Sequence, residues 1–577
     1  MRNWQFYGLL ALAFLVYLLN LCIDVQEVDA AQYAEMSWEM LTTKSFLVVH
    51  NLGRDYLDKP PLLFWLNSFS FYLFGISNLS YKLPSLLFAL LAIYSTYRFA
   101  ALFYRTEVAQ LAALMLATTQ AVFLITNDVR TDTLLMGAVI FSIWQWSAYF
   151  ERRQFGYLIG GSIGLALSLL AKGPIGLIAL GAAMAPHYLL TRQWKKILDL
   201  RLLLALVIVA LALLPMCIGL YQQFGIKGLR FYFWTQSFGR ITGESEWNNH
   251  PDPLFLIHTS AWAFQPWALF LFGGWLFSLW QLIKHRFTLP LFRENISVYG
   301  FTLLLLSLML SKYQLPHYAF VVYPLGAVLA ANFYYQLESY PKVKRWFTAL
   351  QLITIFATLP LSLGLLYAFG NFTWLNVVAI TVLFTIGIAL AIAIANPISA
   401  FQQRLLRLAQ KFTNLLGIQV FLQTKVAFAL NTAYKTLIPL SAILIILCNT
   451  LLSVYWFPAI LKYQPQNQFG RYIAQQKQPY YTYGYAPEFS TVFYAEAMPV
   501  AVFWDPQELK NIIKNHSSAL VITTAAGVQQ LQQNAVKIEV IQQLPAFKVA
   551  KMNFKFINPA TRLQVCEQQV LAKVIAQ

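Results

Sequence analysis

Long apolar runs recur along most of this 577-residue chain, and they limit the fold more than any other feature. Each run approaches the length of about 20 residues that an α-helix needs to cross a bilayer. Because backbone groups must be hydrogen-bonded within the hydrocarbon, such runs predict membrane-spanning helices. About thirteen runs are found, near residues 6–23, 83–103, 108–126, 133–150, 156–171, 173–190, 202–222, 254–282, 298–311, 316–335, 347–370, 373–395 and 437–457.

Composition agrees with a polytopic α-helical membrane protein. Hydrophobic residues make up 58% of the chain and charged residues only 11%, whereas soluble domains carry about 25% charged residues. The net charge of +18 comes from Lys and Arg in short loops, without a basic stripe of interleaved aromatic residues, so we expect no nucleic-acid partner. The four cysteines are scattered without metal-ligand spacing and are interpreted as core residues.

The basic residues fall in alternate loops, including residues 152–153, 192–201, 284–293 and 342–345. The positive-inside rule places these loops in the cytoplasm. The N-terminus is then cytoplasmic, and the first loop and the C-terminal segment lie outside. The first run also has features of a signal peptide, but the acidic residues before the candidate cleavage site at 28–30 favour an uncleaved helix.

Two regions differ from the apolar runs. Residues 396–436 mix Lys and Arg with Leu and Phe at helical spacing, which predicts amphipathic helices on the cytoplasmic leaflet. Near the C-terminus, PYYTYGY, VAVF and ALVITT predict strands, while PQELKNIIKNH and AGVQQLQQN predict helices. We therefore predict a transmembrane domain at 1–457 and a small soluble α/β domain at 458–577.

Acidic residues crowd the first polar interval, residues 24–82, beside the first apolar run. Carboxylates at a bilayer edge are costly to desolvate and usually have a task. Asp29, at the mouth of a helix bundle, could act as a general base on a hydroxyl or amine. The alternative is a solvated helix start in which Asp29 serves as the N-cap.

A second group in this interval is Tyr56-Leu57-Asp58-Lys59-Pro60-Pro61. The proline pair cannot continue a helix from the preceding residues, so it fixes an extended turn at a defined height above the membrane. Lys59 could bind a phosphate, and Asp58 could bind a metal or orient Lys59. An interfacial ion pair is the alternative.

Three further polar groups map to the same side of the membrane: residues 127–132, the loop around Arg240, and residues 312–318. This convergence favours one shared site. Elsewhere the apolar runs carry few charges, with Lys172 the main exception, whereas a proton-coupled transporter is expected to carry more charges near the midplane.

Residues 29–35, DAAQYAE, and 56–62, YLDKPPL, resemble the first outer loop of the bacterial aminoarabinose transferases and the related protein O-mannosyltransferases. Both belong to the GT-C superfamily of polyprenyl-phosphate-sugar-dependent glycosyltransferases. The resemblance extends along the whole chain. It implies a GT-C fold in the inner membrane and inverting transfer of a sugar from a polyprenyl-phosphate carrier to a lipid, glycan or protein acceptor on the periplasmic face. The alternatives are a flippase or transporter of lipid-linked sugars and a structural assembly protein.

The resemblance also implies roles for individual residues. Asp29 matches the catalytic carboxylate, and Asp132 matches a second acidic residue near the site. The residues expected near the lipid phosphate are Tyr56, Lys59, Arg240 and Tyr318. The residues expected to support the site are Gln32, Tyr33, Glu35, Asp58, Asp128, Arg130 and Lys312.

The chain departs from the aminoarabinose transferases at several positions. Gln32 stands where they have Arg, Asp58 replaces a Glu, and Gln236 and Ser237 stand where a metal-binding His would be. These departures argue against aminoarabinose as the donor sugar. We expect no required cofactor, with Asp58 the remaining candidate ligand for a divalent metal. The apolar residues 60–65 are expected to seat the prenyl tail.

Overall fold

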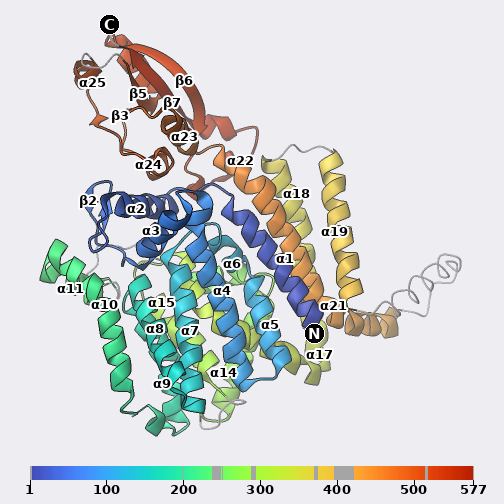
Figure 1. Cartoon of the computed structure of the whole chain (residues 1–577). Helices are drawn as coiled ribbons and strands as arrows, with labels where there is room; N and C mark the ends of the chain where they lie inside the picture. The colour runs from blue at the N-terminus through green and yellow to red at the C-terminus, as the bar shows by residue number, and fades with distance from the viewer. Residues whose placement is uncertain are drawn as a thin grey trace, which may run out of the picture.

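A computed structural model describes residues 3–197, 199–236, 239, 249, 251–287, 294–369, 374–395, 422–513 and 518–575. These residues form a bundle of membrane-length helices with a small sheet-containing unit at one end (Figure 1). The start of α1 (Asn3–Leu21) and the last strand, β7 (Glu567–Ile575), lie at opposite ends of the molecule.

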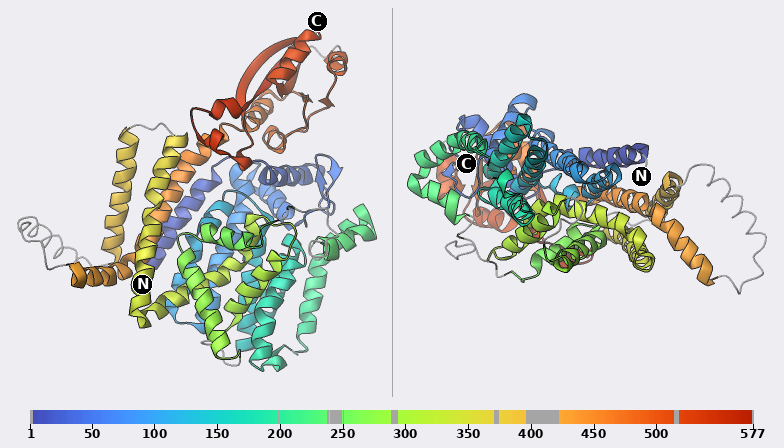
Figure 2. Two further views of the ribbon diagram at one scale, coloured as in Figure 1. Left: turned by 180° about the vertical axis from the view of Figure 1, so that it is seen from behind. Right: turned by 90° about the horizontal axis from the view of Figure 1, so that it is seen from below.

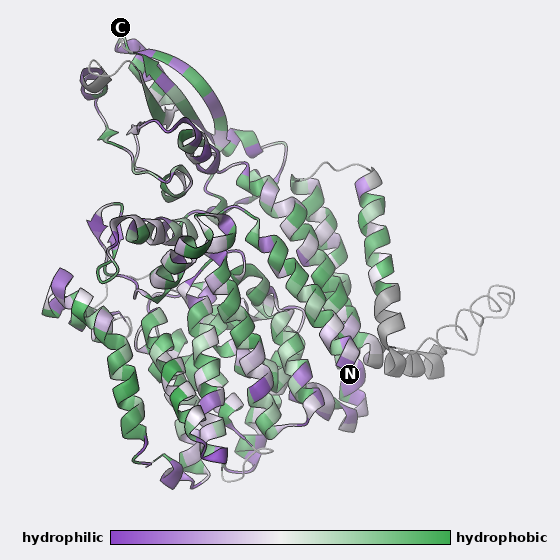
Figure 3. Ribbon diagram, viewed as in Figure 1, coloured by the Kyte–Doolittle hydropathy of each residue, from purple (hydrophilic) through white to green (hydrophobic). Residues whose placement is uncertain are grey.

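Eight helical segments of the described chain are long and apolar enough to cross a membrane. Their hydrophobic residues form a broad band between more polar ends (Figure 3), as expected where the solvent is hydrocarbon. Six shorter apolar helices accompany them. The long segments are Asn3–Leu21, Asn78–Phe103, Thr131–Arg152, Phe155–Lys172, Leu202–Phe224, Pro316–Ser339, Pro341–Phe369 and Thr436–Leu461.

The centre of the bundle is α7 (Thr131–Arg152). Of the residues in its 18-residue apolar stretch, 94% are buried. It packs against α4 (Asn78–Phe103) and α8 (Phe155–Lys172). A Cβ at Gly137 would lie 2.5 Å from the backbone oxygen of Phe88 in α4. Only glycine therefore allows this close approach of the two helices, which fixes the position of the first turn of α7.

The helices α18 (Thr358–Phe369), α19 (Trp374–Ala395) and α21 (Leu422–Leu451) stand beside α1 at one edge of the bundle. The helix α10 (Leu202–Phe224) lies at the opposite edge, as both views of Figure 2 show. Of the predicted amphipathic segment at 396–436, residues 396–421 lie outside the described residues, and the remainder belongs to α21.

Three elements between α1 and α4 lie across the end of the bundle that faces the sheet unit (Figure 1). They are α2 (Asp29–Thr43), the two-stranded hairpin of β1 (His50–Asn51) and β2 (Arg54–Asp55), and α3 (Leu62–Phe74). The predicted break at the proline pair is confirmed, because α3 begins directly after Pro61.

The sheet unit contains five strands in the order β4-β3-β5-β7-β6. The strand β3 (Tyr480–Tyr483) runs parallel to β4 (Val502–Phe503) and β5 (Ser518–Thr524). The strand β7 runs antiparallel to β5 and to β6 (Lys537–Ala546). All three predicted strands are present, as are the predicted helices α25 (Pro506–Ile513) and α26 (Ala525–Gln533).

Among the described residues of this unit, two strands and three α-helices were not predicted, one of these helices being the short α27 (Phe554–Ile557). The strands β6 and β7 carry Gln, Glu and Lys among their apolar residues, which obscures a period of two. The helices α23 (Gln466–Gln476) and α24 (Phe489–Ala495) lie between the sheet and α2, and α24 packs directly against α2.

Candidate active site

Asp29 is the first residue of α2, and its side chain is 40% exposed. The N-cap position is held by Val28, and no side chain caps this helix. The N-cap interpretation of Asp29 is therefore wrong. The Asp29 carboxylate instead accepts a hydrogen bond from Nη1 of Arg130, in the loop before α7.

Arg130 is held between two carboxylates. Its Nε donates to Oδ2 of Asp128 at 2.8 Å, while its Nη1 donates to Asp29. The Arg130 side chain is only 17% exposed, so these charge-assisted bonds fix the guanidinium and, through it, the Asp29 carboxylate. The predicted supporting residue Arg130 thus contacts the predicted catalytic residue Asp29, and the other predicted supporting residue, Asp128, holds Arg130.

Tyr56, Asp58 and Lys59 form a connected group in the loop before α3. Lys59 Nζ donates to Oδ2 of Asp58 at 2.5 Å, and the Tyr56 hydroxyl hydrogen-bonds to Asp58. Burial, and then the carboxylates of Asp58 and Asp29, raise the pKa of Tyr56 well above its usual value of 10. Tyr56 therefore remains a neutral hydroxyl.

A pocket with an empty volume of about 730 Å³, including its open mouth, lies beside this group. Its polar side chains come from elements that are far apart in the sequence but that meet at this pocket. Its apolar wall continues into the helices. The polar lining residues are Lys59, Asp132, Lys172, Gln236, Ser307, Ser311 and Tyr318, and the apolar ones are Leu135, Ile175, Ile178, Leu308 and Val321.

A buried ion pair forms one side of the pocket. Lys172 Nζ donates to Oδ1 of Asp132, and it lies 3.9 Å from the ring centroid of Tyr318. Nε2 of His317 lies 3.7 Å from Oδ2 of Asp132. Asp132 belongs to the first turn of α7, Lys172 is the last residue of α8, and Tyr318 lies in η3 (Pro316–Val322).

The arrangement can hold an anion attached to an apolar chain. The side chains of Lys59, Lys172 and Tyr318 lie at the polar end, beside the carboxylate of Asp132, and aliphatic side chains line the rest. Phosphates bind where such fixed cations and hydroxyl groups converge. Lys59 lies between this pocket and the group around Asp29, because Tyr56 is close both to Asp58, the partner of Lys59, and to the Asp29 carboxylate.

Gln236, at the end of η2 (Phe231–Thr235), donates from its side-chain amide to the backbone oxygen of Asp58. It therefore supports the Asp58–Lys59 loop. Tyr33 is buried, with its ring 5.9 Å from that of Phe64, and Gln32 precedes it in the first turn of α2. Arg240 and Ser237 lie outside the described residues.

Glu35 does not support the pocket as expected, because it lies on another face of α2. Six residues after Asp29, a helix has turned its side chain by about 120° relative to that of Asp29. The carboxylate of Glu35 accepts from the backbone N–H of Leu52, and that of Glu39 accepts from Gly53. Burial, and then the Glu39 carboxylate, raise the pKa of Glu35 to about 9. This pair holds the β1–β2 turn.

Lys312 was also expected to support the site, but the structure leaves it exposed. Its backbone oxygen accepts a hydrogen bond from the backbone N–H of Asn249, and the neighbouring Ser311 lines the pocket instead. Lys172 and His317 were not predicted as site residues. The signal was present in Lys172, since an ionisable residue within a membrane helix is a functional candidate by default.

The predicted apolar wall at residues 60–65 is mostly internal. Leu63 and Phe64 are fully buried, so they cannot contact a lipid tail. Trp65 lines a separate apolar groove on the other side of α3, with an empty volume of about 1060 Å³ including open space. The other residues of this groove are Leu41, Phe46, Leu47, Ser68, Phe69, Tyr72 and Pro215.

The fold is that of the GT-C glycosyltransferases, and the resemblance stated from the sequence is confirmed. A family model described as dolichyl-phosphate-mannose-protein mannosyltransferase matches residues 58–218. The solved structure of ArnT from Cupriavidus metallidurans bound to undecaprenyl phosphate is similar over 99% of this chain and 98% of that one, with a TM-score of 0.69 and 18% identity. The apo form of that protein gives a TM-score of 0.63 at 17% identity, covering 98% and 97% of the two chains.

The sequence is also similar to those of curated transferases, over less than half of this chain. The chain is 26% identical over 267 residues to an undecaprenyl phosphate-alpha-4-amino-4-deoxy-L-arabinose arabinosyl transferase of Proteus mirabilis, covering 45% of this chain and 47% of the relative. A transferase of the same name from Erwinia tasmaniensis is 28% identical over 252 residues, which cover 43% and 45% of the two chains. The chain thus spans about half the length of these relatives.

Proposed function

We propose that this protein is an inverting glycosyltransferase that moves a sugar from a polyprenyl-phosphate carrier to a lipid, glycan or protein acceptor. One observation carries the proposal: an oriented carboxylate, Asp29, and a two-lysine pocket with an apolar wall lie at the same end of the bundle. Tyr56 lies near both the Asp29 carboxylate and Asp58, the partner of Lys59. A carrier phosphate fits the lysines, and a prenyl chain fits the wall.

In this mechanism the pocket stabilises the leaving group. As the bond between the anomeric carbon and the phosphate oxygen breaks, negative charge grows on the phosphate. Lys59 and Lys172 are fixed by Asp58 and Asp132 before the reaction, so they can stabilise that charge with little reorganisation. Tyr318 lines the same pocket, and we assign its hydroxyl as a further donor to the phosphate.

Asp29 acts as the general base. It takes the proton from the acceptor hydroxyl or amine while that group forms a new bond to the anomeric carbon, on the face opposite the departing phosphate. A single displacement of this kind inverts the anomeric configuration. Arg130 does not take part in proton transfer; it orients the Asp29 carboxylate through their hydrogen bond.

We propose that transfer needs no resident metal. A divalent ion would require several oxygen ligands. The carboxylate of Asp58 is already paired with Lys59. The side-chain N–H of Gln236 donates to the backbone oxygen of Asp58, and an N–H group cannot bind a metal ion. The described residues contain no cluster of three or more His, Cys, Asp or Glu side chains suited to a metal.

We further propose thirteen membrane spans: the eight long segments and every shorter apolar helix except α3, which lies across the end of the bundle. The loop charges then give a cytoplasmic N-terminus, an active site on the periplasmic face of the inner membrane, and a periplasmic α/β domain at 458–577 following the transmembrane domain at 1–457. Reporter fusions at Arg153 and Lys196 should report cytoplasm, and a fusion at Gln577 should report periplasm. A cytoplasmic C-terminus would contradict this topology.

Undecaprenyl phosphate is the carrier we propose, because a solved structure that resembles this chain over 99% of its length is that of a protein bound to that lipid. The test has two parts. Mass analysis of the cell envelope with and without the protein should identify a missing sugar on one acceptor. The purified protein in liposomes should then transfer that sugar from its undecaprenyl-phosphate form. Movement of the intact donor across the bilayer, without transfer, would instead support a flippase.

A further inference from the structure

The seven residues 22–28 join α1 to the proposed base Asp29. Side chains of the sheet unit bind this linker at Asp24, Val25 and Glu27. We infer that the sheet unit sets the position of Asp29 through this linker, with Arg471 and Gln464 as positioning residues. The inference rests on the proposed function for the role of Asp29. It assigns the sheet unit the role of positioning the proposed base.

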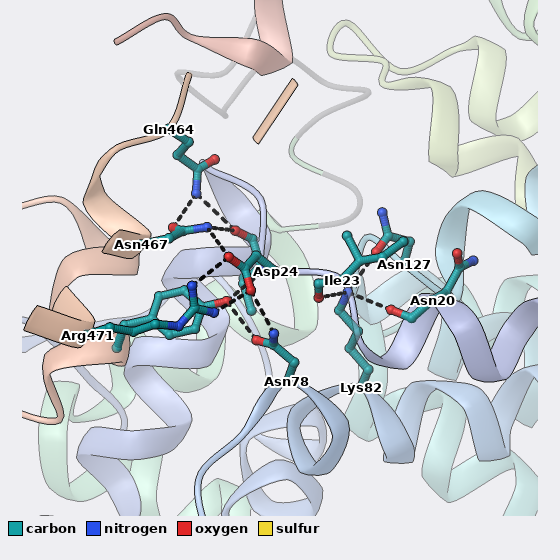
Figure 4. A network of polar contacts seen from close by, with 11 residues as sticks. Asn20, Ile23, Asp24, Asn78, Lys82, Asn127, Gln464, Asn467 and Arg471 are labelled. Carbon is teal, nitrogen blue, oxygen red and sulfur yellow. Dashed lines mark hydrogen bonds and ion pairs between the residues drawn. The ribbon is translucent and has the colours of Figure 1, made fainter. Parts of the chain in front are cut away.

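Asp24 is the charged attachment point (Figure 4). Arg471, on α23, donates from Nη1 to Oδ2 of Asp24 at 2.9 Å and from Nη2 to Oδ1. The Asp24 carboxylate also accepts from Nδ2 of Asn78 at 2.9 Å and of Asn467 at 3.4 Å. Although burial opposes it, Arg471 and these amides lower the pKa of Asp24. A bidentate arginine–carboxylate pair of this kind fixes direction as well as distance.

The backbone of the linker is held as well. The backbone N–H of Val25 donates to the Tyr494 hydroxyl at 2.8 Å, and its backbone oxygen accepts from Nε2 of Gln464 at 2.9 Å. The backbone N–H of Glu27 donates to Oε1 of the same Gln464 at 2.9 Å. One glutamine therefore pairs with two linker residues, much as a neighbouring strand would.

Lys82 of α4 also holds the linker, at the end that follows α1. This fully buried lysine donates to the backbone oxygens of Asn20 and Ile23, at 3.0 and 2.7 Å, and to Oδ1 of Asn127 at 2.7 Å. Asn127 begins the loop that carries Arg130. The same network (Figure 4) thus anchors both the linker that leads to Asp29 and the loop that supplies its arginine partner.

The geometry predicts that loosening the linker lowers kcat without weakening carrier binding. Lys59 and Lys172 reach the pocket from the loop before α3 and from the end of α8, neither of which belongs to this network. Loosening the linker should therefore displace the base and leave the phosphate pocket in place. Misplacing a reacting group by about 1 Å can cost up to about a hundredfold in rate. The prediction is a lower kcat with unchanged carrier binding.

The test compares Arg471→Gln, Arg471→Lys and a control, Lys477→Gln, in full-length protein in lipid nanodiscs. Lys477 is an exposed cation at the end of the same helix, α23. Hydrogen exchange of residues 24–35, binding of undecaprenyl phosphate, and kcat are measured for each. Should Arg471→Gln fail to fold, Gln464→Met removes the uncharged contacts instead.

For Arg471→Gln, we expect exchange at 24–35 to rise by about tenfold, kcat to fall by about tenfold or more, and the Kd of undecaprenyl phosphate to stay within about twofold. Arg471→Lys should recover part of both effects, and Lys477→Gln should match the parent. Exchange unchanged in Arg471→Gln or Gln464→Met would overturn the inference, as would faster exchange with parental kcat. If the linker loosens but the parent transfers no sugar, the glycosyltransferase proposal fails while the attachment by Arg471 stands.

Discussion

Arg130 and Asp29 form an ion pair although 101 positions separate them in the sequence. The pair joins the start of α2 to the loop before α7, and Asp128 holds the far side of the same guanidinium. The proposed base is thus oriented by a residue that need not touch either substrate. This relationship leads to the first prediction.

Replacing Arg130 by Gln should lower kcat by about tenfold to a hundredfold, because Asp29 keeps its charge but loses its fixed direction. Binding of the carrier lipid should change little, since Lys59 and Lys172 are untouched. The exposed Arg54 of β2 offers a matched control in Arg54→Gln. Steady-state kinetics on both variants decide the matter, and a parental kcat in Arg130→Gln would exclude an orienting role.

The buried pair of Lys172 and Asp132 predicts a stability effect. Their side chains are 15% and 5% exposed. Lys172→Met leaves a buried carboxylate without its main partner, so the free energy of unfolding should fall by about 3–5 kcal/mol. Adding Asp132→Leu should recover much of that loss in denaturation experiments. Carrier binding should remain weak in the double variant, because the ammonium group is still missing. Recovery of binding together with stability would assign Lys172 a purely structural role.

Glu27 predicts how stability depends on pH. Burial, and then the Glu488 carboxylate, raise the pKa of Glu27 to about 8 from 4.5. For an acid whose pKa is higher in the folded state, the stabilising contribution is complete below the unfolded pKa and is lost as pH rises through the folded pKa. Thermal midpoints of the parent should therefore fall between about pH 5 and pH 8. Glu27→Gln should show a flatter profile, and an identical slope would refute the assignment.

Thorough chelation should leave turnover unchanged, because Asp58 is already paired with Lys59 and Tyr56. The measurement is sugar transfer before and after treatment with a strong chelator, with each divalent metal added back in turn. Activity that disappears in chelator and returns with one specific metal would show that Asp58 is a metal ligand after all.

Sequence patterns predicted the fold better than they predicted the contacts of the site. Hydrophobic runs mark membrane helices directly, because hydrocarbon tolerates little else. The resemblance at residues 29–35 and 56–62 pointed to the loop that does carry Asp29 and Lys59. It did not separate Glu35 from the site, since only the rotation of α2 directs that carboxylate toward the β1–β2 turn.

The pairing partners could not be predicted from the sequence. Nothing in local spacing connects Arg130 with Asp29 or Lys172 with Asp132, because both contacts depend on how α2, α7 and α8 pack. The attachment of Asp24 to Arg471 joins residues 447 positions apart. Such contacts follow from tertiary structure, and for that reason the C-terminal residues gave no functional signal in the sequence.

The most direct test of the account is the turnover of Asp29→Asn in liposomes with a defined polyprenyl-phosphate sugar donor. Asn keeps the size of Asp and can still accept a hydrogen bond from Arg130, but it cannot take a proton from the acceptor. We predict that kcat falls by at least about a hundredfold, while folding and binding of the carrier lipid stay close to those of the parent. Turnover within a few-fold of the parent would contradict the account and remove Asp29 from the mechanism.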